Sequence, residues 1–281
     1  MANNIHWFPG HMSKALREVE EKIKMMDVVI ELFDARAPLS SINEQLEEVS
    51  KNKKKLYLIS KSDLADPVQT AKWAEHFKNA NSEVVVVNLL NKNTFDIISK
   101  AVIKLGKAKW DKDIARGMKP QPIRTMIIGI PNVGKSSLIN LLAKRKAAGV
   151  QNRPGYTRGE QWIKVNKDFL LLDTPGILPM NYENKQKAAN LALIGSIREE
   201  ILPNTDLVIH LLKYMKERYP DALKDRFGIE EIKDYTETLG MIATKRGLLI
   251  SNGQYDLLKA EALLLKEFKD GLLGRMTLEW L

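Results

Sequence analysis

Short apolar runs up to residue 173 predict strands, and longer segments with helical spacing separate them. Six runs combine the length and the β-branched content that strands favour. They are residues 27–33, 56–59, 84–87, 125–129, 161–165 and 169–173. The first four are almost continuously apolar, which is typical of parallel strands buried on both faces. Asn166-Lys167-Asp168 separates the last two runs and favours a hairpin there.

The strands alternate with four segments of helical periodicity, which are residues 13–26, 68–79, 94–109 and 136–142. Alternation of this kind is typical of proteins in which helices cover both faces of a parallel sheet. We therefore predict an α/β fold with a doubly wound, mostly parallel six-stranded sheet.

The pattern changes beyond residue 177, where strand signals become scarce and apolar residues recur at helical spacing. Proline and glycine residues divide this part into short segments. We predict two domains, an α/β domain at 1–178 and a small all-helical domain at 179–281. Residues 206–212 fit either a strand or a buried helical turn, and periodicity alone does not decide between them.

The length and composition narrow the class of protein. The 281 residues exceed one typical domain and suit two. The absence of cysteine excludes disulfides, thiolate metal sites and thiol nucleophiles. No apolar run approaches the roughly 18 residues that span a bilayer, and the first residues lack a secretory signal pattern. We expect a cytoplasmic protein without a membrane partner, and we expect a monomer.

Positive charge is concentrated in two stretches of a chain whose formal net charge is +9. Eight basic residues lie between Lys100 and Arg124, and six lie between Lys144 and Lys164. Concentrated positive charge attracts a polyanion, and nucleic acid is the usual one. The alternative is a solvated helix face together with a loop that surrounds nucleotide phosphates.

One stretch, Gly129-Ile-Pro-Asn-Val-Gly-Lys-Ser136, matches the phosphate-binding pattern G-x4-G-K-[ST] between a predicted strand and a helical run. Its glycines let backbone N–H groups turn toward phosphate oxygens, which the dipole of the following helix also favours. We expect Lys135 to contact the β and γ phosphates and Ser136 to ligate Mg²⁺. The predicted nucleotide-binding residues of this P-loop are Asn132, Val133, Gly134, Lys135, Ser136 and Ser137.

Two later segments complete a triphosphate site. Asp173-Thr-Pro-Gly176 ends the last predicted strand, so Asp173 suits a second Mg²⁺ anchor and the Gly176 N–H can reach a γ phosphate. Residues 152–159 form a basic loop in which Thr157 is the candidate to meet Mg²⁺ and the γ phosphate. Ordinary surface turns are the alternative interpretation of both segments.

A base-reading segment lies before the P-loop and not after it. Ser60-Lys61-Ser62-Asp63 ends a predicted strand and resembles the guanine-reading pattern N-K-x-D. Asp63 could accept hydrogen bonds from guanine N1–H and N2–H₂, a donor pair that adenine lacks. Lys61 can cover the purine face, whereas Ser60 makes fewer hydrogen bonds than asparagine. The alternative is that Ser62 or Asp63 caps the following helix.

The order of these segments predicts a permuted site. The strand at 84–87 leads into Asn88 and Leu89, where a second base-contacting loop is expected. Ligands gather at the carboxyl ends of strands in whatever order the chain visits them. A circularly permuted GTPase domain therefore keeps one site. In it, the segment after Asp173 leads directly into the helical domain, which the nucleotide state could move.

Four stretches carry a resemblance to a known family over nearly the whole chain. They are Trp7-Phe-Pro-Gly-His-Met12, Asp34-Ala-Arg-Ala-Pro38, Gly129–Ser136 and Leu172-Asp-Thr-Pro-Gly-Ile177. They resemble the circularly permuted bacterial GTPases of the ribosome biogenesis GTPase A (YlqF/RbgA) family. The resemblance implies a GTPase that acts in late assembly of the 50S ribosomal subunit and is stimulated by the maturing particle. It also implies contacts with the 50S precursor and its rRNA, the latter through the helical domain.

The chain departs from the family at Ser60, where asparagine is usual, and at Asn88-Leu89-Leu90, which lacks the usual small-residue base loop. Both departures weaken the inference of guanine selectivity. Two other hypotheses stay open. One is a P-loop enzyme that uses ATP, which a loss of guanine selection at Ser60 would favour. The other is a nucleotide-gated binding module with negligible turnover, which Ile177 and a mobile His11 would allow.

Ile177 stands where many GTPases carry the glutamine that orients the attacking water, so intrinsic hydrolysis should be slow. The resemblance implies His11 as the residue that positions this water, and the catalytic set is then His11, Lys135 and Thr157. Alternatively, His11 packs beside Trp7 or contacts RNA. Asn132 resembles the asparagine with which related GTPases bind K⁺, although it could simply satisfy backbone groups of the loop.

Overall fold

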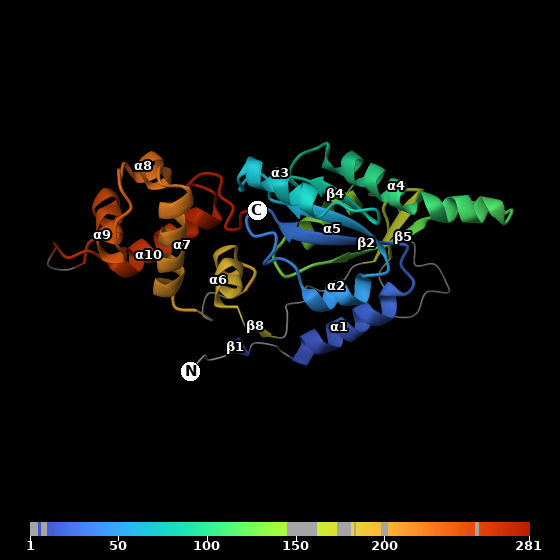
Figure 1. Ribbon diagram of the computed structural model, residues 1–281, viewed down its shortest axis with the longest axis horizontal. Helices are drawn as coiled ribbons and strands as arrows, with labels where there is room; N and C mark the ends of the chain where they lie inside the picture. The colour runs from blue at the N-terminus through green and yellow to red at the C-terminus, as the bar shows by residue number, and fades with distance from the viewer. Residues whose placement is uncertain are drawn as a thin grey trace.

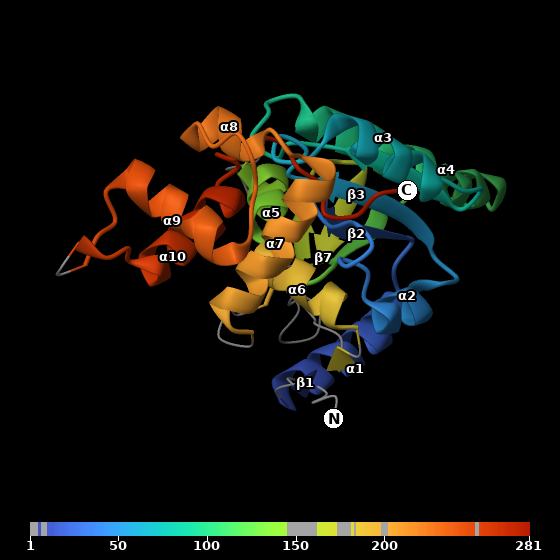
Figure 2. The same cartoon turned by 60° about the vertical axis from the view of Figure 1, so that its left-hand side comes forward.

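The computed structural model describes residues 5–6, 10–144, 162–172, 181–182, 184–197, 202–250 and 253–281. Figures 1 and 2 show a twisted sheet with its helices and, at one end of that sheet, a group of C-terminal helices. Two short strands, β1 (Ile5–His6) and β8 (Asn181–Tyr182), pair antiparallel apart from the main sheet.

The six predicted strands form one sheet, as expected. They are β2 (Val28–Asp34), β3 (Lys54–Ser60), β4 (Ser82–Val86), β5 (Ile123–Ile128), β6 (Trp162–Lys164) and β7 (Phe169–Leu172). Their order is β4-β3-β2-β5-β7-β6, and every pair is parallel except the hairpin of β6 and β7. All seven residues of the central strand β2 are buried, which agrees with its continuous apolar run. β4 differs because it is an edge strand, and Val86 there is 39% exposed.

Helices cover both faces of this sheet and bury alternate residues of β2. On one face, α1 (Gly10–Ile23) and α2 (Glu44–Ser50) pack against Val29. On the other, α4 (Thr94–Ala115) and α5 (Lys135–Lys144) pack against Ile30. The aromatic residues of α3 (Pro67–His76) join Phe33 and Tyr57 in a third cluster. Figure 1 shows α1 and α2 below the sheet and α4 above it.

One helix was not predicted. α2 is short, and Asn43 starts it by accepting hydrogen bonds from the N–H groups of Gln45 and Leu46. Its seven residues bury only Leu46 and Ser50, so the apolar stripe is too brief to produce a periodic signal. The helix depends on its cap and on the contact of Leu46 with the sheet.

The C-terminal part is helical, as predicted. It contains α6 (Lys185–Leu193), α7 (Asn204–Arg218), α8 (Ala222–Phe227), α9 (Tyr235–Arg246) and α10 (Leu257–Lys269). Residues 206–212, which fitted either a strand or a helix, lie within α7. The predicted domain boundary after residue 178 lies outside the described residues, so the two-domain division stays a prediction. The apolar core runs without interruption from the sheet into these helices.

The last seven residues of the chain return from the helices to the sheet. The Met276 and Leu278 N–H groups donate to the carbonyl oxygens of Leu64 and Arg36, at 3.1 and 2.6 Å. The Trp73 indole N–H donates to the Glu279 carbonyl at 2.9 Å. These partners are more than 200 residues apart in the chain. The tail therefore ties the helical part to the segments that follow β2 and β3 and to α3.

The packing of α4 on β5 leads to a stability prediction. A Cβ added to Gly106 would lie 2.2 Å from Cδ1 of Ile123. Gly106→Ala should therefore destabilise the protein by about 1–3 kcal/mol through overpacking, although alanine is the better helix former. Urea unfolding followed by circular dichroism measures this change.

Gly240→Ala in α9 is the matched control, since its Cβ would lie 3.3 Å from the Tyr255 ring. It should change the free energy of unfolding by less than about 1 kcal/mol. Adding Ile123→Val to Gly106→Ala should recover part of the loss. A Gly106→Ala protein as stable as the original chain would show that α4 does not pack on β5 in this way.

Candidate nucleotide site

The predicted site segments meet at one edge of the sheet. β3 ends at Ser60 and leads into the S-K-S-D segment (residues 60–63), and β5 ends at Ile128 and leads into the P-loop. β2 lies between these two strands and is parallel to both. Parallel strands place their carboxyl ends together, so the two segments become neighbours although about 70 residues separate them in the sequence.

The P-loop (residues 129–136) has the backbone conformation that its glycines permit. Gly129 and Gly134 have φ values of +147° and +108°, a region that L side chains rarely adopt. A Cβ on Gly129 would also lie 2.9 Å from the Leu32 carbonyl oxygen. Asn132 has a left-handed φ of +60°. Residue types with permissive backbones therefore allow this loop to turn tightly against β2.

Lys135 lies within the loop and its ammonium is buried against it. Its Nζ donates to the carbonyl oxygens of Gly129 and Ile130 at 3.0 and 2.7 Å. Ser136 and Ser137 follow in the first turn of α5 and are exposed. The cation and the first N–H groups of α5 thus stand together, which is an arrangement that binds phosphate.

The S-K-S-D segment does not cap the helix that follows it. The N-cap of α3 is Asp66, whose carboxylate accepts from the N–H groups of Val68 and Gln69 at 2.8 and 3.0 Å. Asp63 is exposed, and no described residue hydrogen-bonds to its carboxylate. The capping alternative is therefore wrong for both Ser62 and Asp63, and the Asp63 carboxylate remains available to a ligand.

Ser60 joins the base-reading strand to the P-loop. Its buried hydroxyl lies 2.6 Å from the Val133 carbonyl oxygen and 3.0 Å from that of Phe33. One hydroxyl proton can be donated to only one acceptor at a time. The shorter distance indicates that the bond to Val133 dominates, so this serine links the two halves of the site.

The loop after β4 also reaches the P-loop. Cδ1 of Leu89 lies 2.9 Å from the position that a Cβ on Gly134 would occupy. The Asn88 side chain accepts a hydrogen bond from the Leu90 N–H at 2.8 Å, which shapes the turn. In addition, the Ser62 N–H donates to the Val87 carbonyl at 3.3 Å. The structure thus brings the expected second base loop beside the first.

Asn132 connects the P-loop to the helical part. Its side-chain amide nitrogen donates to the Gly195 carbonyl at 2.8 Å, just beyond the end of α6. Asn132 therefore does more than hydrogen-bond to backbone groups of its own loop, which was the alternative interpretation. This contact leaves the amide oxygen as the atom that could ligate a cation.

Several predicted residues lie outside the described part of the chain. They are Trp7, Phe8, Thr157, Asp173, Gly176 and Ile177. His11 lies in the first turn of α1, but only its backbone is described. The expected roles of these residues stay predictions.

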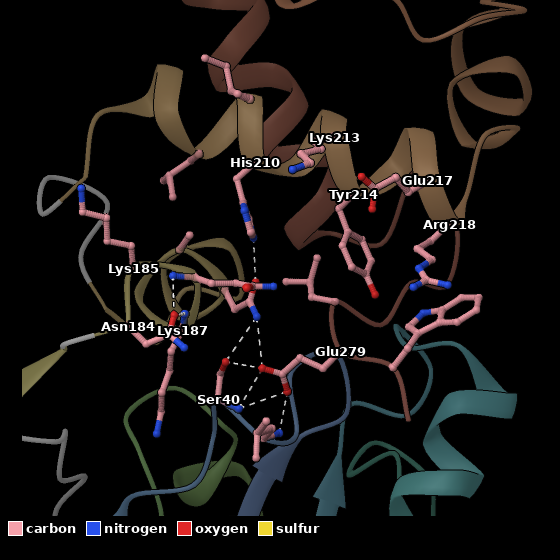
Figure 3. A pocket seen from close by; sticks show the side chains of 18 of the residues that line it. Ser40, Asn184, Lys185, Lys187, His210, Lys213, Tyr214, Glu217, Arg218 and Glu279 are labelled. Atoms are coloured by element: carbon pink, nitrogen blue, oxygen red, sulfur yellow. Dashed lines mark hydrogen bonds between the residues drawn. The ribbon is translucent and has the colours of Figure 1, made fainter.

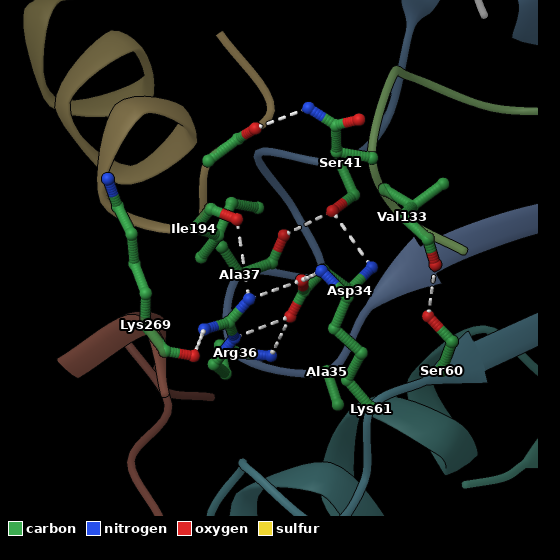
Figure 4. A network of polar contacts seen from close by, with 12 residues as sticks. Asp34, Ala35, Arg36, Ala37, Ser41, Ser60, Lys61, Val133, Ile194 and Lys269 are labelled. Atoms are coloured by element: carbon green, nitrogen blue, oxygen red, sulfur yellow. Dashed lines mark hydrogen bonds and ion pairs between the residues drawn. The ribbon is translucent and has the colours of Figure 1, made fainter. Parts of the chain in front are cut away.

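A buried ion-pair network at the end of β2 was not assigned a role from the sequence. The Arg36 guanidinium binds both carboxylate oxygens of Asp34, with Nε–Oδ1 and Nη2–Oδ2 distances of 3.0 and 2.8 Å. Lys61 Nζ lies 2.9 Å from the same Oδ2. Figure 4 shows the network between β2, the S-K-S-D segment and the helical part. The only sequence signal was a charged D-A-R triplet directly after a buried strand.

The C-terminal tail supports the S-K-S-D segment from the opposite side. Arg275 donates from Nη2 to the Ser62 carbonyl at 2.7 Å and from Nε to the Ala65 carbonyl at 2.9 Å. No pattern in the sequence pairs residue 275 with residue 62, because the contact is long-range and ends on backbone atoms. The S-K-S-D segment is therefore held by the tail as well as by Val87, the residue after β4.

A cavity of about 920 Å³ lies away from this site, between α6, α7 and the C-terminal tail (Figure 3). His210 Nε2 lies 2.9 Å from Asn190 Oδ1, and the Asn190 amide donates to the Glu279 carboxylate at 3.1 Å. Burial raises the pKa of Glu279. Burial, and then the nearby Lys213 ammonium, lower the pKa of His210. None of the lining residues belongs to the P-loop or the S-K-S-D segment, so the cavity is not the nucleotide site.

Comparison with known proteins relates the chain to one family of GTPases. A family model described as "50S ribosome-binding GTPase" matches residues 124–249. The ribosome biogenesis GTPase A of Bacillus cereus is 44% identical over 98% of this chain and 93% of its own length. The GDP-bound structure of TM YlqF has a TM-score of 0.68 at 28% identity and covers 94% of this chain and 99% of its own. The GNP-bound structure of YlqF from T. maritima has a TM-score of 0.66, also at 28% identity, over 95% and 98%.

The strand order, the P-loop and the upstream base-reading segment define a P-loop GTPase with a circularly permuted chain. β3 leads into the S-K-S-D segment, and β5, which follows it in the chain, leads into the P-loop. Given the identity to curated relatives over nearly its full length, the chain belongs to the ribosome biogenesis GTPase A family.

The Ser60 hydroxyl provides a test of how the two halves of the site are joined. Ser60→Ala leaves the buried Val133 carbonyl without its donor, so the protein should lose about 1–3 kcal/mol of unfolding free energy. GDP affinity should fall as well, because the P-loop loses a tie to the base-reading strand. Urea unfolding and fluorescent-GDP titration measure the two effects.

Ser99→Ala on α4 is the control, since the buried Ser99 hydroxyl has no hydrogen-bond partner among the described residues and lies outside the predicted site. It should lower neither stability nor affinity. If Ser60→Ala behaved like Ser99→Ala, the hydroxyl bond would not join the two segments.

Proposed function

We propose that this GTPase drives a late step in the assembly of the 50S ribosomal subunit and binds a precursor of that subunit and its rRNA. The observation that carries the GTP-dependent part is the meeting of the P-loop and the S-K-S-D segment through Ser60 and Val133. The ribosomal part rests on membership of the family. We further propose that the protein acts as a monomer in the cytoplasm, where such particles mature.

Guanine is selected by Asp63. The exposed carboxylate accepts hydrogen bonds from N1–H and N2–H₂, and adenine offers no matching pair. The Lys61 stem covers one face of the purine. Lys61 has a left-handed φ of +56°, so the backbone turns sharply at this residue. Asn88 and Leu89 border the base from the neighbouring strand end.

The phosphates bind over the P-loop, where Val133, Gly134 and Ser137 contribute backbone N–H groups. Lys135, which is held inside the loop by two carbonyl oxygens, neutralises the β and γ phosphates. Ser136 has an exposed hydroxyl in the first turn of α5, and hard oxygen atoms of this kind suit Mg²⁺. Thr157 and Asp173 complete the Mg²⁺ ligands, and Gly176 donates its N–H to the γ phosphate. Bound Mg²⁺ neutralises charge that develops on the phosphates.

Hydrolysis depends on a residue outside the P-loop. Ile177 cannot orient a water molecule. The resemblance to the family supports His11, at the start of α1, in this role when the ribosomal particle is bound. Asn132 would hold K⁺ at the P-loop, where the ion would supply positive charge to the phosphates. The Asn132 amide nitrogen is already used by the Gly195 carbonyl, and this orientation supports ligation by the oxygen.

Two surfaces are suited to rRNA. Basic side chains stand exposed on α4 and on the segment that follows it, in particular Lys100, Lys104, Lys107, Lys112, Arg116 and Lys119. Dense exposed positive charge attracts a phosphate backbone. The helical part provides the second surface, and its contacts with Asn132 and Arg36 link it to the nucleotide site.

The base assignment predicts a change in selectivity. In Asp63→Asn, GDP affinity should fall at least about tenfold, because the carboxylate that accepts both guanine donors is lost. Affinity for xanthosine diphosphate should rise, since the asparagine amide can donate to the xanthine 2-oxygen. Competition of fluorescent GDP by each diphosphate and by ATP measures both. ATP competing with GTP on equal terms in the unchanged protein would contradict guanine selection.

The hydrolysis assignment predicts that turnover depends on the particle. Precursors of the 50S subunit should accelerate GTP hydrolysis, and His11→Ala should reduce the stimulated rate about 100-fold without changing GTP affinity. His76→Ala on α3 is the matched control and should leave the rate unchanged. Absence of stimulation would favour the binding module with negligible turnover. Replacing K⁺ by Na⁺ tests Asn132, and equal rates in both salts would remove the cation from the proposal.

A further inference from the structure

The carboxylate of Asp34 has no free hydrogen-bonding position. Its Oδ1 accepts from the Arg36 backbone N–H and from Nε, both at 3.0 Å, and its Oδ2 binds Arg36 Nη2 and Lys61 Nζ. A carboxylate has about four acceptor sites, so all are used here. The Asp34 N–H in turn donates to the Ser41 hydroxyl at 3.1 Å. The carboxylate therefore cannot turn toward another partner without breaking one of these bonds, and it holds the Lys61 ammonium at Oδ2.

Arg36 is held from its other side by the helical part. Nη1 donates to the Lys269 carbonyl at 3.2 Å and Nη2 to the Ile194 carbonyl at 3.4 Å (Figure 4). Both carbonyls lie at the ends of helices, α10 and α6, where the helix dipole is negative. The guanidinium is only 2% exposed. It therefore spans the boundary between the strand end and two helix ends through direct hydrogen bonds.

The Asp34 carboxyl is held in its ionised form by its two cationic neighbours. Burial alone would raise the pKa of Asp34, but the Arg36 guanidinium and then the Lys61 ammonium lower it to about 2. The carboxylate is therefore ionised at neutral pH. Lys61 is less buried than its partners, with 26% of its side chain exposed, so a ligand can reach it.

We propose that Asp34 is a positioning residue for guanine binding, because it fixes the Lys61 ammonium, and that Arg36 in turn fixes Asp34 against α6 and α10. The inference rests on the proposed role of Lys61 at the purine. It goes further, because it makes the affinity for the nucleotide depend on where the ends of two distant helices lie. A shift of either helix end would weaken a hydrogen bond of Arg36. Asp34 and then Lys61 would be held less firmly as a result.

The test is a double-mutant cycle between Arg36 and Lys61 on the full-length protein. Arg36→Lys keeps a positive charge beside Asp34 but loses the planar fork that reaches both helix ends. It should accelerate dissociation of fluorescent GDP about tenfold, the effect of losing one charge-assisted bond. In the Lys61→Met background the same substitution should produce no further acceleration, because the lysine that Arg36 acts through is gone.

Arg226→Lys is the matched control, since Arg226 forms a similar forked pair with Glu267 within the helical part. It should lower stability without changing GDP dissociation. An equal acceleration by Arg36→Lys in both backgrounds, or none in either, would overturn the proposal. If Arg36→Lys does not fold, as judged by near-ultraviolet circular dichroism, Asp34→Asn takes its place in the same cycle.

Failure of the proposed function gives a different result. The unchanged protein would then not bind GDP, or would bind ATP equally well. The unchanged protein could bind GDP selectively while Arg36→Lys accelerates GDP dissociation equally in both backgrounds. The GTPase assignment then stands, and only the positioning role of Asp34 is lost.

Discussion

Parallel pairing of the central strands is the constraint on which this structure depends. β2 lies between β3 and β5, all seven of its residues are buried, and its position brings the S-K-S-D segment and the P-loop to one edge. Strand ends of a parallel sheet meet whatever the order of the chain. For this reason a GTPase can place its base-reading segment first and still form one site. The Ser60–Val133 hydrogen bond then joins the two segments directly.

The helical part is coupled to this edge through polar contacts as well as through the apolar core. Asn132 reaches the Gly195 carbonyl, Arg36 reaches the ends of α6 and α10, and Arg275 holds the base-reading loop. Hydrogen bonds of this kind are directional, so they transmit a displacement that apolar packing could absorb. In a protein that is proposed to act on a ribosomal particle, they offer a route between the nucleotide and the helices.

Much of the site was predictable because its segments are local in sequence. The P-loop needs glycines at fixed spacing between a strand and a helix, and the structure has that context at Gly129 and Gly134. Asp63 was ambiguous, since the same residue type caps helices. The structure resolved this by assigning the cap to Asp66. The alternative for residues 206–212 was likewise resolved only by packing, because a helix buried against α10 and a short buried strand have similar apolar content.

The sequence by itself determined the six strands, the helical C-terminal part, the P-loop and the candidate base reader, since each depends on residues close together in the chain. Tertiary structure alone decided that Asp34 is the partner of Lys61, that Arg36 ends on two helix carbonyls, and that the tail returns to the S-K-S-D segment. These contacts join residues up to about 230 positions apart, and many end on backbone atoms that every residue type carries. No local pattern encodes them, because they arise only when the sheet and the helices have packed together.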